Sequence, residues 1–318
     1  MITRRALLGG AAALAFVRVG RAEEAAPIVF VHGDSDSAAV WQSTFWRFES
    51  NGYPREKLFA ISFTNPQARA DDGAEQADRS SSEDERKELA AFVDDVLAKT
   101  GAAKVALVAN SRGCNTTRNF LAHGGAAKAS HAVLCGGVNH GVFAVPVMTG
   151  SEYNGQGAFM TALNVGDETA AGVKFLTLRS DGFDLYAQPD GAYIGQPGMK
   201  TNITPDGPAL KGATNLVLDH IDHRETAFSP RAFAEMYAFV VGHAPTRIAD
   251  ELLPRYKYCL LTNSYRKLDA PINVDIKPGD FRCLDLTAPP FGFKGSFVYS
   301  FPSPLWEEIR VFLMYGNA

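Results

Sequence analysis

The chain has 318 residues, a formal net charge of −4 at pH 7 and 46% hydrophobic residues. A net acidic chain has no basic surface of the kind that binds nucleic acid, so we expect no nucleic-acid partner. The four cysteines include no C-x-x-C pair, which leaves a zinc ribbon or a thioredoxin-like site without support.

The first 22 residues are typical of a signal peptide. Arg4 and Arg5 precede an uncharged run over residues 6–17 that is too short to span a bilayer, and Gly20-Arg21-Ala22 closes the segment with small residues. The paired arginines resemble a twin-arginine signal. Removing residues 1–22 takes away four arginines and no acid, which moves the formal charge from −4 to −8. We therefore expect a periplasmic or secreted protein whose mature chain has no transmembrane segment.

Six short apolar runs have the pattern of parallel strands that are buried on both faces. They lie at residues 28–31, 58–61, 105–109, 132–134, 173–178 and 215–218. Between several of them the pattern is helical: one helix is predicted from a capping box of Ser82 and Glu85 to Gly101, and another begins at Ser229-Pro230. Strands that alternate with helices predict an α/β domain with a mostly parallel sheet, which we place at residues 23–245.

Residues 246–318 have a different character. Alternating apolar residues at Ile272, Val274 and Ile276 precede a Pro-Gly-Asp turn, and further short apolar runs follow. This pattern predicts a small β-rich C-terminal domain of roughly 70 residues, a size that is marginal for independent folding. Docking on the larger domain or a cysteine pair would help to stabilise it.

The most informative stretch runs from Val105 to Cys114. An apolar strand leads directly into Asn110-Ser111-Arg112-Gly113 and then into a helical pattern. A serine at such a turn between strand and helix presents its hydroxyl outside the sheet, as in a nucleophile elbow. Ala109 stands where the elbow formula usually has glycine, and alanine is small enough for the close passage of the helix. Ser111 is therefore a candidate nucleophile, although a serine that merely caps a helix would carry the same short motif.

A serine nucleophile needs an imidazole as its base and a carboxylate that orients the imidazole. The loop after the fifth predicted strand offers two acids, Asp181 and Asp184, and the loop after the sixth offers two imidazoles, His220 and His223. Both loops follow the carboxyl ends of strands, where open α/β sheets build their sites. The chain order of serine, acid and histidine is that of α/β-hydrolases.

Four separated motifs together resemble bacterial lipases and esterases of the α/β-hydrolase fold. They are Val31-His-Gly-Asp34 after the first strand, Leu134-Cys-Gly-Gly-Val-Asn-His-Gly141 after the fourth, Asp184-x-x-x-Gln188-Pro189 after the fifth and Asp222-His-Arg-Glu-Thr-Ala-Phe-Ser-Pro230 after the sixth. The likeness spans about residues 27–244, and the motifs follow one another in the order of that group.

The resemblance implies that Ser111 is the nucleophile, Asp184 the acid and His223 the base. His220 is the rival base and Asp181 the rival acid, because each stands in the same loop as the favoured residue.

The resemblance also implies an oxyanion hole made of the backbone N–H groups of Asp34 and Arg112. An aspartate side chain beside an oxyanion is electrostatically unfavourable, so we expect the Asp34 carboxylate to point away. His32 and His140 are expected to brace their loops rather than to transfer protons.

Export changes the expectation for the cysteines, because thiols pair in an oxidising compartment. Four cysteines allow three connectivities. We predict the pairs Cys114 with Cys135 and Cys259 with Cys283, against the alternative of buried free thiols.

The same loop is also a candidate metal site. It contains Asp219, His220, Asp222 and His223, and imidazoles and carboxylates at short spacing can chelate zinc or iron. A metallohydrolase would need further ligands from another loop, and the sequence has no H-E-x-x-H or similar motif. We expect no cofactor and no metal.

The insertion at residues 141–148 and 153–160 is apolar and interrupted by glycines. It is suited to form a wall or lid over an acyl-binding cleft, or alternatively a surface connection between two strands. The sequence thus predicts a secreted serine ester hydrolase, a lipase or carboxylesterase, that acts on small-molecule or lipid esters and contacts a lipid interface transiently. The alternatives are a polyester depolymerase with the same triad, a metal-dependent hydrolase and an inactive hydrolase scaffold that serves as a binding module.

Overall fold

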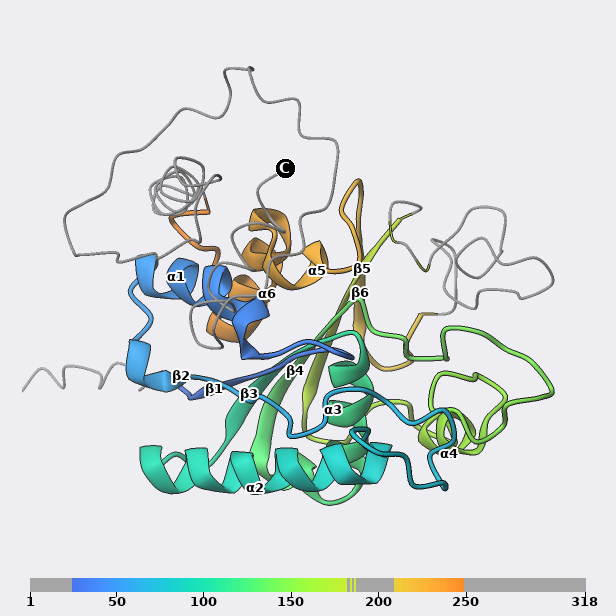
Figure 1. Cartoon of the computed structure of the whole chain (residues 1–318). Coiled ribbons are helices and arrows are strands. Elements are labelled where there is room, and N and C mark those ends of the chain that lie inside the picture. Colours follow the sequence, from blue (N-terminus) through green and yellow to red (C-terminus); the bar gives the residue numbers. More distant parts are fainter. Residues whose placement is uncertain (1–24, 182–183, 185, 187–208, 249–318) are drawn as a thin grey trace, which may run out of the picture.

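The computed structural model describes residues 25–181, 184, 186 and 209–248 (Figure 1). The predicted signal peptide at residues 1–22 and residues 249–318 of the predicted β-rich domain, including Cys259 and Cys283, lie outside the described residues, so both remain predictions. Within the described part, no helix combines the length and the apolar character that a membrane span requires.

Six parallel strands form one sheet in the order β2-β1-β3-β4-β5-β6. The strands are β1 (Ile28–Val31), β2 (Leu58–Ala60), β3 (Val105–Asn110), β4 (Ala129–Cys135), β5 (Lys174–Ser180) and β6 (Thr214–Leu218). All six predicted strands and the α/β class are confirmed. Because every strand runs in the same direction, the carboxyl ends meet at one edge of the sheet, and the loops that leave them are brought together there.

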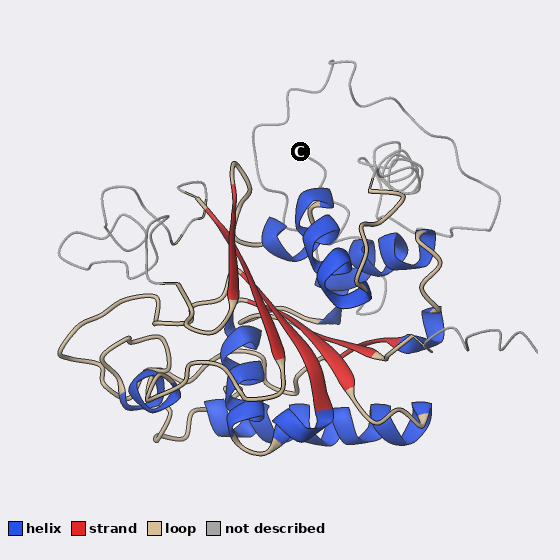
Figure 2. Ribbon diagram, turned by 180° about the vertical axis from the view of Figure 1, so that it is seen from behind, coloured by secondary structure: helices blue, strands red, loops and turns tan. Residues whose placement is uncertain are grey.

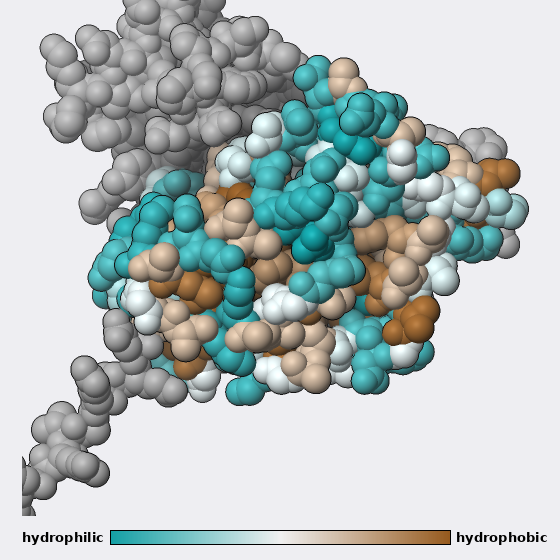
Figure 3. Space-filling model, turned by 90° about the horizontal axis from the view of Figure 1, so that it is seen from below, coloured by the Kyte–Doolittle hydropathy of each residue, from teal (hydrophilic) through white to brown (hydrophobic). Residues whose placement is uncertain are grey.

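Helices cover both faces of the sheet (Figures 1 and 2). One face packs against α1 (Gln42–Ser50) and α6 (Pro230–Val241), and the other packs against α2 (Ser82–Thr100) and α3 (Arg112–Ala122). The outer side of the α2 layer mixes hydrophilic and hydrophobic residues (Figure 3). The short helices are η1 (Ala38–Trp41), η2 (Arg55–Lys57), η3 (Gly125–Lys128), α4 (Ala158–Leu163) and α5 (Glu225–Phe228).

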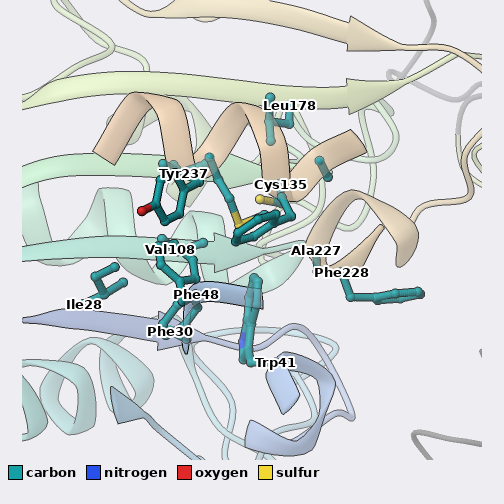
Figure 4. Packing of buried hydrophobic residues seen from close by; sticks show 14 of the residues in the cluster. Ile28, Phe30, Trp41, Phe48, Val108, Cys135, Leu178, Ala227, Phe228 and Tyr237 are labelled. Atoms are coloured by element: carbon teal, nitrogen blue, oxygen red, sulfur yellow. The ribbon is translucent and has the colours of Figure 1, made fainter. Parts of the chain in front are cut away.

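Several aromatic residues pack in the core between the sheet and the α1–α6 layer (Figure 4). Phe48 of α1 is fully buried and lies edge-on against Phe30, Tyr53 and Phe233, with ring centroids 5.3–5.8 Å apart. Edge-to-face pairs at this spacing stabilise a core beyond the area they bury. This packing joins β1, α1 and α6, so one face of the sheet is covered by a closely packed layer.

The predicted start of α2 is wrong by one residue. Ser81 is the N-cap and forms the capping box with Asp84, whereas the sequence pattern assigned those roles to Ser82 and Glu85. The Ser82 hydroxyl and N–H both bond to Asp72 instead. Glu85 is buried, with 1% of its surface exposed. Tertiary partners therefore decide which serine caps the helix. The other predicted cap is confirmed, because the Ser229 hydroxyl accepts from the N–H of Ala232 at the start of α6.

The predicted disulfide between Cys114 and Cys135 is wrong, because both residues are free and buried thiols. Cys114 belongs to the core under α2 and α3, whereas Cys135 belongs to the core under α1 and α6, so their side chains lie on opposite faces of the sheet. Burial raises the pKa of both thiols above the ordinary range. The two residues lie on neighbouring elements. Because their side chains are on opposite faces of the sheet, a disulfide between them would require a strand to move.

Gly113 is required where α3 crosses the end of β1. A methyl group at this position would clash with the carbonyl oxygen of His32 and lie 2.7 Å from that of Val31. Backbone atoms cannot move aside as a flexible side chain does. We expect Gly113→Ala to lower the free energy of unfolding by roughly 3 kcal/mol in urea titrations, despite the better helix propensity of alanine.

The matched control is Gly73→Ala. A methyl group at this exposed glycine meets nothing closer than a carboxylate oxygen of Asp71 at 3.4 Å, so its free energy of unfolding should stay within about 0.5 kcal/mol of wild type. Equal stabilities of the two variants would contradict the close approach of α3 and β1.

Candidate active site

Ser111 lies at the turn between β3 and α3. Its φ of 52° and ψ of −121° fall in a region that a residue with a side chain adopts only under strain. Its N–H donates to the carbonyl oxygen of Cys135 at 2.9 Å, which ties the turn to β4. A methyl group at Gly33 would lie 2.8 Å from Cβ of Ser111, so the chain after β1 passes directly beside the serine. The strained strand-to-helix turn that the sequence predicts is present.

Asp184 and His223 form a buried pair. Nδ1 of His223 lies 2.9 Å from Oδ2 of Asp184, and the exposed fractions of the two residues are 6% and 2%. The other carboxylate oxygen accepts from the N–H of Tyr186 at 2.9 Å, and the Tyr186 ring packs edge-on against the imidazole with centroids 4.7 Å apart. Because a carboxylate only accepts, Nδ1 carries the proton, and Nε2 of the neutral ring is left as an acceptor.

The imidazole of His223 lies beside the serine turn. Gly136 directly follows Cys135, whose carbonyl receives the N–H of Ser111, and a methyl group at Gly136 would lie 3.2 Å from Cε1 of His223. Nε2 of His223 is buried and has no hydrogen-bond partner among the described residues. The structure therefore brings the serine, the histidine and the acid to one end of the sheet.

The side chains of the rival residues form a separate, more exposed pair. The His220 side chain is 70% exposed, and its Nδ1 lies 4.0 Å from a carboxylate oxygen of Asp181. The two histidines thus face different acids. Among the described residues no three side chains of the types His, Cys, Asp and Glu converge as metal ligands would. Gln188 and Pro189 of the predicted acid motif lie outside the described residues.

Asp34 and Arg112, which the sequence nominates as oxyanion donors, flank the serine. Asp34 follows the close passage of Gly33, and Arg112 is the first residue of α3, whose N–H is not used by the helix itself. The carboxylate of Asp34 accepts from Ala68 N–H at 3.0 Å and from the hydroxyls of Ser35 and Tyr153.

The Arg112 side chain is fully buried between two carboxylates. Its Nη1 lies 2.5 Å from Oε1 of Glu85 and its Nε lies 2.6 Å from Oε1 of Glu152. Nη1 also donates to the Pro66 carbonyl and the Ser80 hydroxyl, and Nη2 donates to the Ser80 carbonyl. Truncating one member of such a buried set leaves an uncompensated charge, so these contacts join α2, α3 and the insertion after β4 tightly.

Burial governs the protonation of this set. It raises the pKa of Glu85 to about 8 and that of Glu152 to about 7, although the Arg112 guanidinium opposes both shifts. Burial by itself lowers the pKa of Arg112, and the carboxylates of Glu152 and Glu85 more than reverse this, so its pKa is raised. One cation facing two buried acids favours a proton on one of them near neutral pH.

His32 and His140 have the bracing contacts expected of them. Nε2 of His32 accepts from the N–H of Phe63 at 3.1 Å and Nδ1 donates to the carbonyl of Gly33 at 2.8 Å, so both ring nitrogens are occupied. Burial lowers the pKa of His32, which keeps the ring neutral. Nε2 of His140 lies 3.3 Å from a carboxylate oxygen of Glu168.

Two polar residues that the sequence analysis did not single out connect the loops. The amide of Asn110 donates to the carbonyl of Cys135 at 3.0 Å and to the hydroxyl of Thr226 at 3.2 Å, and that hydroxyl donates to the carbonyl of His223 at 2.6 Å. The chain of contacts links the serine turn to the histidine loop. Asn110 is the variable position of the elbow motif, so the motif alone gives no signal for this role.

A small apolar cluster adjoins the histidine. Its members are Val138, Val142 and Phe143, with Val145, Tyr153 and Tyr186 packed against them. Tyr186 belongs both to this cluster and to the contact with His223. The insertion at residues 141–148 therefore contributes apolar side chains to a cluster that reaches the candidate base through Tyr186, while Val147 and Met148 are exposed.

Comparison with protein families finds a match to the model of class 2 lipases over residues 25–168. This segment contains Asp34, Ser111 and Arg112 and ends before Asp184 and His223. No curated protein matches the chain. The match to the class 2 lipase model confirms the resemblance to bacterial lipases and esterases that the sequence motifs suggest.

Solved structures with a similar fold include bacterial lipases. The lipase BlEst2 of Bacillus licheniformis in its propeptide form has a TM-score of 0.50 and 19% identity, and the alignment covers 71% of this chain and 52% of that one. The mature form gives a TM-score of 0.49 at 18% identity over 69% and 93% of the two chains. A gene product of Listeria innocua, lin2722, gives 0.48 at 12% identity over 70% and 97%. At these identities the likeness to the propeptide form shows the α/β-hydrolase fold.

Proposed function

From the class 2 lipase match over residues 25–168 and the α/β-hydrolase fold, we propose that the chain is a serine ester hydrolase with Ser111, His223 and Asp184 as its triad. One observation carries the proposal: a buried histidine that is oriented by a buried aspartate, and whose Nε2 has no hydrogen-bond partner among the described residues, lies at the same end of the sheet as a serine on a strained turn. That is the arrangement by which an imidazole activates an alcohol.

The reaction follows from these positions. Oγ of Ser111 attacks the ester carbonyl as Nε2 of His223 takes the hydroxyl proton, and Asp184 stabilises the imidazolium. The oxyanion of the tetrahedral intermediate accepts hydrogen bonds from the N–H groups of Asp34 and Arg112, each worth roughly 3 kcal/mol. His223 returns the proton to the leaving alcohol, which leaves an acyl-serine. Water, deprotonated by His223, then releases the carboxylic acid and restores the serine.

The apolar cluster beside His223 favours esters with an apolar acyl chain. Val142 and Phe143 are buried in this cluster, and the partly buried Tyr186 joins it to the imidazole of the candidate base, so the base has an apolar surrounding of the kind that suits an acyl chain. The signal-like sequence at residues 1–22 supports action in the periplasm or outside the cell. Lipid esters and small carboxylic esters are thus the proposed substrates, and the exposed Val147 and Met148 suit transient contact with a lipid interface.

Covalent labelling tests this function. A fluorophosphonate probe should modify Ser111, as mapped by peptide mass spectrometry, and should abolish turnover of p-nitrophenyl esters in proportion to labelling. Ser111→Ala should fold yet remain unlabelled, and a chelator should leave wild-type activity unchanged. A panel of acyl chain lengths and a polyester film separate a lipase from an esterase or a depolymerase. Label elsewhere, or activity that the chelator removes and Ser111→Ala retains, would contradict the proposal.

A further inference from the structure

The two residues proposed as oxyanion donors both carry charged side chains that the donor role does not use. Those side chains are held by consecutive residues of the insertion after β4. Nε of Arg112 lies 2.6 Å from Oε1 of Glu152, and the hydroxyl of Tyr153 lies 2.5 Å from Oδ2 of Asp34. One dipeptide therefore reaches both sides of the serine turn, from an element that is distant in sequence from each donor.

The dipeptide is itself fixed by the insertion. The carbonyl of Tyr153 accepts from the N–H of Val142 at 2.8 Å, and the N–H of Gly155 donates to the carbonyl of Phe143 at 2.7 Å. The fully buried side chain of Asn154 bonds to the backbone of Val145, Val147 and Met148. These bonds close the segment on itself, so Glu152 and Tyr153 project from a cross-linked loop rather than from a loose one.

The contact with Asp34 explains why an acid is tolerated there. The Tyr153 hydroxyl and the N–H of Ala68 share one carboxylate oxygen, and the Ser35 hydroxyl donates to the other. Three donors hold the negative charge in one place, and with it the peptide that carries the Asp34 N–H. The Arg112 side chain fixes the other proposed donor in the same way, through contacts to Glu152 and Glu85.

We propose that Glu152 and Tyr153 form a positioning clamp that sets the spacing of the two oxyanion N–H groups, with Tyr153 acting through the Asp34 carboxylate. The inference rests on the proposed function and adds two residues outside the triad. Donors that are fixed before the reaction need no reorganisation as the oxyanion forms. The clamp therefore acts on the transition state and leaves the binding of the ester ground state largely unchanged.

The test is a double-mutant cycle of Tyr153→Phe, Asp34→Ala and both changes together, measured on a p-nitrophenyl ester with active sites counted by fluorophosphonate titration. We expect each single change to lower kcat about tenfold per titrated site with KM within about twofold. The double variant should be no slower than the slower single variant, because both changes break the same contact. A trifluoromethyl ketone, which mimics the tetrahedral intermediate, should lose affinity in parallel with kcat.

The matched control is Tyr53→Phe. The Tyr53 hydroxyl likewise donates to a partly buried partner, the carbonyl of Ala26, but the Tyr53 ring packs in the α1–α6 core and not in the insertion after β4. This variant should lower the melting temperature and leave kcat per site unchanged. Multiplicative losses in the double variant, or an unchanged kcat in Tyr153→Phe, would overturn the clamp. Failure of the proposed function is a separate result, since wild type would then show neither labelling of Ser111 nor turnover.

Discussion

Replacing His223 by asparagine is expected to lower kcat on the order of a million-fold, because the protein then has no base to accept the proton of the Ser111 hydroxyl. Asparagine is the sharpest choice at this position. Its amide nitrogen lies where Nδ1 lies and still donates to Asp184, so the change removes Nε2 with little effect on the buried pair. Steady-state turnover of a p-nitrophenyl ester, corrected for folded protein by circular dichroism, measures the loss.

The control is the same change at the rival histidine. His220 is exposed and has a φ of 58°, a backbone conformation that asparagine tolerates well. His220→Asn should keep kcat within about twofold of wild type. If instead His220→Asn removes activity and His223→Asn retains it, the base is assigned to the wrong residue.

Asp184→Asn is expected to lower kcat about ten-thousand-fold while leaving the fold intact. The carbonyl oxygen of the new side chain can still accept from the N–H of Tyr186, which turns the amide NH₂ toward Nδ1 of His223. Nδ1 then has to accept, so the ring proton moves to Nε2. The imidazole is held in place in the tautomer that cannot receive the serine proton. Ester turnover under saturating substrate measures the effect.

Asp181→Asn provides the comparison within the same loop. Oδ2 of Asp181 accepts from the N–H of His220 at 3.2 Å, a contact that an asparagine oxygen can keep. Its kcat should remain near that of wild type. Equal losses of kcat in the two variants would show that the loop after β5 acts as a structural unit. They would contradict the assignment of Asp184 as the partner of His223.

The strands and the order of the site residues could be predicted because they depend on local patterns. Runs such as residues 105–109 are apolar along their whole length, which only a strand buried on both faces explains well, and the structure buries every residue of β3. Once the sheet is parallel, the loops after β3, β5 and β6 share an edge. The proximity of Ser111, Asp184 and His223 follows from topology without any knowledge of the side-chain contacts.

What could not be predicted depends on which face or which distant partner a side chain meets. Cys114 and Cys135 lie on neighbouring elements, but the first turn of α3 places the Cys114 thiol on the opposite side of the sheet from the Cys135 thiol. Ser82 matches a capping motif as well as Ser81 does, and Asp72 decides between them. The burial of Arg112 between Glu85 and Glu152 joins three segments whose spacing in sequence gives no signal.

The histidine follows an edge strand of the sheet. β6 is five residues long, pairs with β5 at the outer end of the strand order, and has a single buried residue, Leu218. Edge elements with little buried surface open locally at a lower free energy than the interior does. Because fraying of this strand would displace the loop that carries His223 while β1, β3 and β4 stayed intact, we expect ester turnover to be lost on heating before the aromatic core unfolds.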